Sequence, residues 1–286
     1  MITGATNYSG ESFTNFENLV TGAGDDTVTG TTGDNAISTG ANVDLVNAGL
    51  GNDVVSGGDD NDTLNGEDGQ DWLLGGTGAD AETGSTGHDS VWGDAGDDVL
   101  DGGPGDDTII GGAGIDTVTY AGAGSLVWVD LSWIEDQNTY GGGWDTLSGI
   151  ENVIGSAFND RLTGNGAANR ITGGTGADEL AGGSGNDTFA YAALSDSTVA
   201  APDLITDRSA GDKIDLSAID ADTVTAGNQA FHVGASAGHT GDIVLAYDTA
   251  SNTTSVSLFV NNDTVADALI RLSGNHLGLG VADFVL

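Results

Sequence analysis

A unit of nine residues repeats along this chain, and it restricts the fold more than any other feature of the sequence. Residues 21–119 divide into eleven consecutive nonapeptides, and residues 155–190 form a second block of four. A unit such as GGPGDDTII (102–110) shows the pattern: glycine at positions 1, 2 and 4, an acid at position 6 and an apolar residue at position 8. A fixed short period of this kind is typical of solenoids, in which each unit stacks on its neighbours.

Each nonapeptide predicts half a coil, made of one tight turn and one short strand. Glycine adopts positive φ readily and lets neighbouring backbones approach closely, which suits the turn. In the strand that follows, side chains alternate between faces, so the apolar residue at position 8 points inward. Two units complete a coil, and successive coils pair at a spacing of about 4.8 Å. We therefore predict an all-β fold, a parallel β-roll with a thin apolar core between two sheets.

The acids at position 6 fall into columns when the coils stack. Units n and n+2 lie one above the other, and carboxylates one coil apart repel by more than roughly 1 kcal/mol at low effective dielectric. A divalent cation between coils removes this repulsion, and oxygen ligands without thiols favour Ca²⁺, which accepts about six to eight oxygens in irregular geometry. The predicted calcium ligands are Asp26, Asp44, Asp53, Asp62, Asp71, Asp80, Asp89, Asp98, Asp107 and Asp116 in the first block and Asp160, Asp178 and Asp187 in the second.

The columns also predict how many ions the chain can hold. The first block has five gaps between coils in one column and four in the other, and the second block has two, which gives about eleven calcium sites. Gaps bordered by Asn35 or Asn169 should be weaker. A disordered acidic tract is the alternative for a chain with 44 acidic and 5 basic residues. Such a tract, however, would not keep an acid and an apolar residue at fixed positions of a repeat.

Composition excludes several other classes. Five basic residues cannot supply the clustered cations that nucleic acids or anionic membrane surfaces require. The chain has no cysteine, so it has neither disulfides nor a thiolate metal site. No apolar run approaches the roughly 20 residues of a membrane span. The first residues, MITGATNYSG, lack the basic and apolar regions of an N-terminal secretory signal.

The pattern GGxGxDxUx resembles the calcium-binding repeat of the RTX (hemolysin-type) family. Two further segments resemble the C-terminal domain that follows such repeats in serralysin-type metalloproteases: SDSTVAAPDLITDRSAGDKIDLSAID (195–220) and NHLGLGVADFVL (275–286). The resemblance implies that Asp196 and Asp203 complete the last calcium site. It also implies secretion to the extracellular space by a type I (ATP-binding-cassette) machinery, which reads an uncleaved C-terminal signal ending in an acid and apolar residues, here Asp283–Leu286.

These observations predict five regions. Residues 1–20 form a lead-in segment, 21–119 the first β-roll block, 120–154 a β spacer, 155–190 the second block, and 191–286 a serralysin-like capping and secretion domain. The lead-in contains FTNFENLV (13–20), which resembles SGIENVIG (148–155), as though a further segment preceded it. In the spacer, strict alternation predicts one shared face for Val127, Val129, Leu131 and Trp133.

Glu82, Trp72 and Trp92 need separate interpretation. Glu82 occupies an inward position 8; we expect a tolerated defect with its side chain turned to solvent, the alternatives being an extra ligand or a break in the roll. Trp72 and Trp92 occupy outward positions, either as plain exposed aromatics or as a patch that contacts a protein or glycan.

We do not expect an enzyme. The four histidines are scattered and no HExxH is present, so the zinc site of the serralysins is absent. GASAG (234–238) matches the G-x-S-x-G elbow around Ser236, but a glycine-rich chain produces this match by chance. The expected function is that of a secreted calcium-binding protein that is unfolded at cytosolic calcium and folds at the roughly millimolar calcium outside.

Two roles are open to such a protein. One is a structural, surface or matrix protein, with self-association or a cell-surface glycan as further partners. The alternative is the C-terminal folding and secretion module of a larger exoenzyme, such as a protease, lipase or alginate epimerase.

Overall fold

The computed structural model describes residues 12–225, 229–234, 239–261 and 263–286. Over these ranges the chain forms 28 short β-strands and one 3-10 turn, η1 (Val281–Asp283). It divides into two compact units: Met1–Ala123 with Trp133–Asn152, and Gly124–Ser132 with Val153–Leu286. The described residues contain no helix long and apolar enough to cross a membrane.

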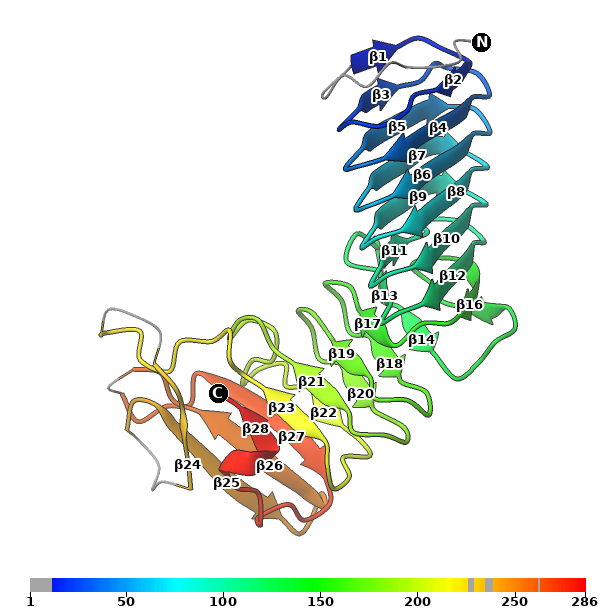
Figure 1. The fold of residues 1–286 in the computed structure, drawn as a ribbon. Helices are drawn as coiled ribbons and strands as arrows, with labels where there is room; N and C mark the ends of the chain where they lie inside the picture. The colour runs from blue at the N-terminus through cyan, green and yellow to red at the C-terminus, as the bar shows by residue number, and fades with distance from the viewer. Residues whose placement is uncertain (1–11, 226–228, 235–238, 262) are drawn as a thin grey trace. The chain divides into compact units, whose positions relative to one another are not determined.

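The first unit is a β-roll whose strands alternate between two parallel sheets (Figure 1). Residues 18 apart pair in register, as Val55 does with Leu73, so each coil lies directly on the one before. One sheet consists of β1 (Ser12–Thr14), β3 (Thr27–Thr29), β5 (Leu45–Leu50), β7 (Thr63–Gly69), β9 (Ala81–Gly87), β11 (Val99–Asp101) and β13 (Thr117–Thr119). The other consists of β2 (Asn18–Val20), β4 (Ala36–Ala41), β6 (Val54–Asp59), β8 (Trp72–Thr77), β10 (Ser90–Ala95), β12 (Thr108–Ala113) and β16 (Trp144–Ser148), with β15 (Gln137–Asn138) antiparallel on β16. The predicted fold class is confirmed.

Position 8 side chains form a layer that makes up most of the core of this unit. All are buried, and burial of an aliphatic side chain contributes roughly 1.5–3 kcal/mol. The apolar members are Val28, Ile37, Val46, Val55, Leu64, Leu73, Val91, Leu100, Ile109 and Val118.

Glu82 lies in the same layer, so the expectation that it turns to solvent is wrong. Its residue is 1% exposed, and it pairs in register with Leu64 and Leu100 on the adjacent strands. The roll is not broken there. Strand alternation fixes the inward direction, and turning Glu82 outward would require a one-residue slip that reverses every side chain of β9.

Glycines make the close stacking possible. At Gly96, position 4 of its nonapeptide, φ is +156° and a Cβ would lie 1.3 Å from the carbonyl oxygen of Gly78 in the preceding coil. Gly33 occupies the same position in an earlier nonapeptide but has nothing within 4 Å of its Cβ position. Glycine at position 4 thus allows the closest approach of the preceding coil, although Asn42 and Asp60 also occupy this position, with φ of 79° and 76°.

The second unit continues the same coil pattern and then changes to antiparallel pairing. One sheet contains β14 (Trp128–Asp130), β18 (Arg161–Thr163), β20 (Glu179–Ala181), β22 (Leu204–Ile205), β27 (Ala268–Ser273), β26 (Thr253–Leu258), β25 (Asp242–Asp248) and β24 (His232–Val233). The other contains β17 (Asn152–Ile154), β19 (Arg170–Thr172), β21 (Thr188–Ala190), β23 (Lys213–Asp215) and β28 (Phe284–Val285). Strands β22 and β23 add a further coil after the last nonapeptide, and β25–β27 form an antiparallel meander beside it.

Residues 120–154, the predicted spacer, divide between the units. Gly124–Ser132 belongs to the second unit and Trp133–Asn152 to the first. Val127, Val129 and Leu131 are buried on one face as expected, whereas Trp133 is 55% exposed and does not share it. Strand β14 ends at Asp130, whose carboxylate accepts the Ser132 N–H at 2.9 Å, and this turn interrupts the alternation.

Candidate metal centre

The acids at position 6 form buried columns along the edges of each roll. Each one lies directly before a strand. In every position 6 acid except Asp26 and Asp160, Oδ1 accepts the backbone N–H of the position 6 residue one coil earlier. The N–H of Asp62 donates to Asp80 at 2.7 Å, and the N–H of Asp80 donates to Asp98 at 2.9 Å. One carboxylate oxygen of each of these eleven acids therefore links two coils.

The second carboxylate oxygen is buried and has no hydrogen-bond partner. Leaving a buried polar atom without a partner costs about 1–3 kcal/mol, and more when the group is charged. Twelve of the fifteen predicted ligands share this condition at Oδ2. They are Asp44, Asp53, Asp62, Asp71, Asp80, Asp89, Asp98, Asp107, Asp116, Asp178, Asp187 and Asp203.

In six coils a backbone carbonyl faces the unpartnered oxygen across a small space beside the glycine at position 1. The acids of these coils are Asp62, Asp71, Asp80, Asp89, Asp98 and Asp116. A Cβ placed on Gly57 would lie 2.3 Å from Asp62 Oδ2 and 2.9 Å from the carbonyl oxygen of Gly75 in the next coil. Within the described ranges, no three or more His, Cys, Asp or Glu side chains converge as a metal cluster. Any ion here would therefore combine carboxylate and carbonyl oxygens, a donor set that suits a hard cation and fits calcium.

Burial shifts the acids away from their ionised form. Desolvation, with Asp44 and Asp80 adding like charge, raises the pKa of Asp62 to about 7. Burial likewise raises the pKa of Asp107 to about 8 and, with Asp98 and Asp80 nearby, that of Glu82 to about 9. Without a cation, protonation is the only other way to neutralise these groups in the folded state.

Metal-depleted protein is therefore expected to gain β-structure as the pH falls from about 7 to about 5. Between 3.8, the ordinary pKa of Asp62, and about 7, its pKa when folded, the folded state binds more protons than the unfolded state. Stability in this window must rise as the pH falls. Far-UV circular dichroism and urea midpoints at several pH values measure it. A metal-depleted chain that loses strand signal on this acidification would contradict the expectation.

Three predicted ligands differ from the other twelve. Asp160 Oδ2 accepts the Ser156 N–H at 2.5 Å, and Asp196 Oδ2 accepts the N–H groups of Ala192 and Ala193 at 2.7 and 2.9 Å. Asp26 begins its column and donates its own N–H to Asp44 Oδ1 at 2.7 Å. The Oδ2 atoms of Asp160 and Asp196 thus accept hydrogen bonds from the protein backbone, so their burial does not require a cation as a partner.

The two asparagines at position 6 are hydrogen-bonded within their own turns. Asn35 Oδ1 accepts the Thr31 N–H at 3.0 Å, and Asn169 Oδ1 accepts the Asn165 N–H at 2.8 Å. The Nδ2 of Asn169 donates to Asn165 Oδ1 at 3.1 Å. An amide at this position closes its turn without any ion.

Three acids outside the nonapeptides extend the columns, and the sequence reasoning missed them. Asp145 and Glu151 accept the N–H groups of Asp107 and Asp116 at 3.1 and 3.0 Å, and Asp212 accepts that of Asp187 at 3.0 Å. Each precedes an inward apolar residue by two positions (D-T-L, E-N-V and D-K-I), which is the tail of the repeat without its turn. This three-residue pattern is visible in the sequence. Each acid, however, lies 25–38 residues after the acid it stacks on, and not 18 residues as within the repeats.

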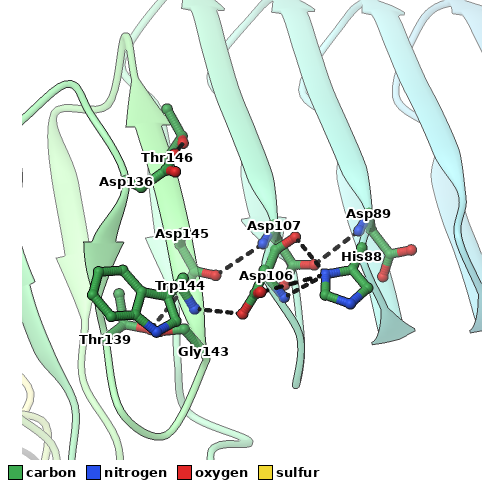
Figure 2. A network of polar contacts seen from close by, with 10 residues as sticks. All are labelled: His88, Asp89, Asp106, Asp107, Asp136, Thr139, Gly143, Trp144, Asp145 and Thr146. Carbon is green, nitrogen blue, oxygen red and sulfur yellow. Dashed lines mark hydrogen bonds and ion pairs between the residues drawn. The ribbon is translucent and has the colours of Figure 1, made fainter.

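Asp145 shows how a column ends without an ion (Figure 2). Its Oδ1 continues the ladder that runs from Asp89 through Asp107. Its Oδ2 accepts the hydroxyl groups of Thr139 and Tyr120 at 2.8 and 2.9 Å. Two protein hydroxyls thus occupy the place that lacks any partner in the coils before it.

Comparison with known proteins points to one family. The model of the family described as Peptidase M10 serralysin C terminal matches residues 5–286. The metalloprotease AprA of Pseudomonas entomophila is 49% identical over 135 residues, 44% of this chain and 28% of that protein. Serralysin C of Dickeya chrysanthemi is 39% identical over 97 residues, 34% of this chain and 19% of that protein.

The matched regions thus span less than a third of the curated relatives' lengths. Among solved structures, the AlgE6R2 subunit of the Azotobacter vinelandii mannuronan C5-epimerase aligns with 63% of this chain and 92% of its own, at 22% identity and a TM-score of 0.38.

Proposed function

Because this chain belongs to the family of serralysin C-terminal domains of the M10 peptidases, we propose that it is a secreted calcium-dependent folding module. Calcium ions lie between successive coils, held by position 6 carboxylates and backbone carbonyls. The chain is unfolded where calcium is scarce and folds where calcium is abundant, outside the cell. Export by a type I secretion machinery belongs to the same proposal, since an unfolded chain suits passage through a narrow channel.

The observation that carries the proposal is the row of twelve buried Asp Oδ2 atoms without hydrogen-bond partners. If each cost even about 1 kcal/mol, their sum would match the whole stability of an ordinary domain, about 5–15 kcal/mol. A divalent cation in each gap converts this penalty into coordination. Binding free energy is then folding free energy, as in other small metal-dependent domains.

The module is proposed to be non-catalytic. The sequence has no HExxH, and the only serine in a nucleophile-elbow pattern, Ser236, lies outside the described residues. The comparisons support a module of a larger exoenzyme, because the relatives named as proteases match this chain over a limited part of their length.

A calcium titration of the metal-depleted chain at pH 7 tests the proposal. We expect far-UV strand signal to appear cooperatively as free calcium rises to about 10⁻⁴–10⁻³ M, with about eleven ions bound at saturation by equilibrium dialysis. Magnesium serves as the control and should restore little structure, because it demands near-octahedral geometry and dehydrates reluctantly. A strand signal that is the same in chelator and in calcium would overturn the proposal.

A structural role on a surface or in a matrix is the second candidate, and one observation favours it. Trp72 and Trp92 lie on the outer face of neighbouring strands β8 and β10, with ring centroids 6.2 Å apart and Trp72 48% exposed. Trp92 is half-buried. An exposed aromatic such as Trp72 suits contact with a glycan or a second chain. The structural role requires ordered assembly on calcium addition, measured by light scattering, whereas the module role requires only a folded monomer.

A further inference from the structure

Glu82 is a buried acid that the repeat does not require. It lies in the apolar layer between Leu64 and Leu100, and its residue is 1% exposed. Both of its carboxylate oxygens are inaccessible to solvent and have no hydrogen-bond partner. An isolated buried carboxylate is among the most unfavourable groups in a protein core, and such groups are normally paired or coordinate a metal.

The carboxylate of Glu82 borders the same small space, beside Gly75, as the position 6 carboxylate of Asp80. A Cβ placed on Gly75 would lie 2.2 Å from Glu82 Oε1, 2.5 Å from Asp80 Oδ2 and 2.9 Å from the carbonyl oxygen of Gly93. The two carboxylate oxygens therefore lie within 4.7 Å of each other, the sum of the first two distances. Three oxygens from two coils thus surround one point beside Gly75.

The adjacent coils lack this third oxygen. Beside Gly57 the same point is bordered by Asp62 Oδ2 and the carbonyl of Gly75, and beside Gly93 by Asp98 Oδ2 and the carbonyl of Gly111. The glycine, the column acid and the carbonyl are the same in all three coils. Glu82 is the feature that distinguishes the gap at Asp80.

We propose that Glu82 is an additional ligand of a divalent-cation site formed with Asp80 and the carbonyl of Gly93, and that this gap binds calcium more tightly than its neighbours. Calcium affinity rises with the number of charged ligands, and a second carboxylate supplies one. The same ion gives both buried carboxylates a partner. This inference rests on the proposed function, since it assumes that calcium enters the gaps between coils.

Two substitutions in the full chain test the inference. Glu82→Gln keeps the shape and removes the charge, and Glu82→Leu installs the kind of apolar residue found at position 8 elsewhere. Calcium bound by each is counted by equilibrium dialysis across a series of buffered free calcium concentrations. Both variants should lose the tightest ion, with one calcium fewer per chain at low free calcium and at least a tenfold higher Kd for that site. Glu67→Gln is the matched control, because it removes the same charge from an exposed position of β7, and should leave the count unchanged.

The outcomes separate this inference from the proposed function. If the unmodified chain binds calcium and both Glu82 variants bind the same number with the same affinities, Glu82 is a defect of the core and the inference is wrong. In that case Glu82→Leu should unfold at a higher temperature without loss of calcium. If the unmodified chain binds no calcium, the proposed function itself fails.

Discussion

Replacement of Gly96 by alanine is expected to lower the free energy of unfolding by at least about 3 kcal/mol, one of the largest effects available to a single methyl group. The new Cβ would lie 1.3 Å from the carbonyl oxygen of Gly78, a backbone atom that cannot rotate away. The φ of +156° adds strain for any L side chain. Urea or thermal unfolding in saturating calcium, followed by circular dichroism, measures the loss.

Gly33→Ala is the matched control for this prediction. Gly33 occupies position 4 of its nonapeptide, as Gly96 does, but nothing lies within 4 Å of the added methyl. The control should change stability by no more than about 0.5 kcal/mol. Equal losses in the two variants would mean that position 4 requires glycine for the turn alone and that coil stacking is not the cause.

Neutralising three successive members of one column should have opposite effects with and without calcium. In Asp62→Asn/Asp80→Asn/Asp98→Asn the amide keeps an oxygen and removes the buried charge. At saturating calcium the triple variant should bind about four ions fewer, because four gaps border these residues, and it should be less stable. At pH 7 without calcium it should be more folded than the unmodified chain, since three unpartnered carboxylates are gone. Asn35 and Asn169 are natural precedents, each closing its own turn.

The control for the triple variant removes the same charge from solvent. Asp60, Asp68 and Asp94 are exposed acids on the same stretch of coils. Their replacement by asparagine changes the net charge by the same amount and should leave the calcium count unaltered. Equal loss of calcium in both triple variants would mean that diffuse charge, rather than the columns, attracts the ions.

The sequence was sufficient for the repetitive part of the fold. The period of nine and the alternation around position 8 predicted two parallel sheets, and residues 18 apart do pair in register. Alternation could not predict that β14 stops at Asp130, because that depends on a local turn to Ser132, and so Trp133 was placed on the wrong face. Glu82 points inward because strand register fixes its direction, and the hydrophilicity of the side chain does not override that register.

The candidate site was predicted in outline and missed at its ends. The position 6 acids stack as their spacing requires. Asp145, Glu151 and Asp212 follow insertions of irregular length, and only the folded chain reveals that each accepts an amide from the last coil of its column. Likewise, the period of the repeat could not predict that the hydroxyls of Tyr120 and Thr139 donate hydrogen bonds to Asp145 Oδ2.

The ladder of amide-to-carboxylate bonds has a consequence for how the roll can be shortened. All of these hydrogen bonds run in the same direction, because the backbone N–H of one coil donates to a carboxylate of the coil that follows it in the chain. The two ends of the stack are thus chemically unlike. If coils are removed from the amino-terminal side, the next coil keeps carboxylate oxygens that no longer accept an N–H, and water can hydrate them. If coils are removed from the carboxyl-terminal side, the last remaining coil keeps backbone N–H groups that have lost their carboxylate acceptors. The roll is therefore directional along its axis, and the loss of a coil has a different chemical consequence at each end.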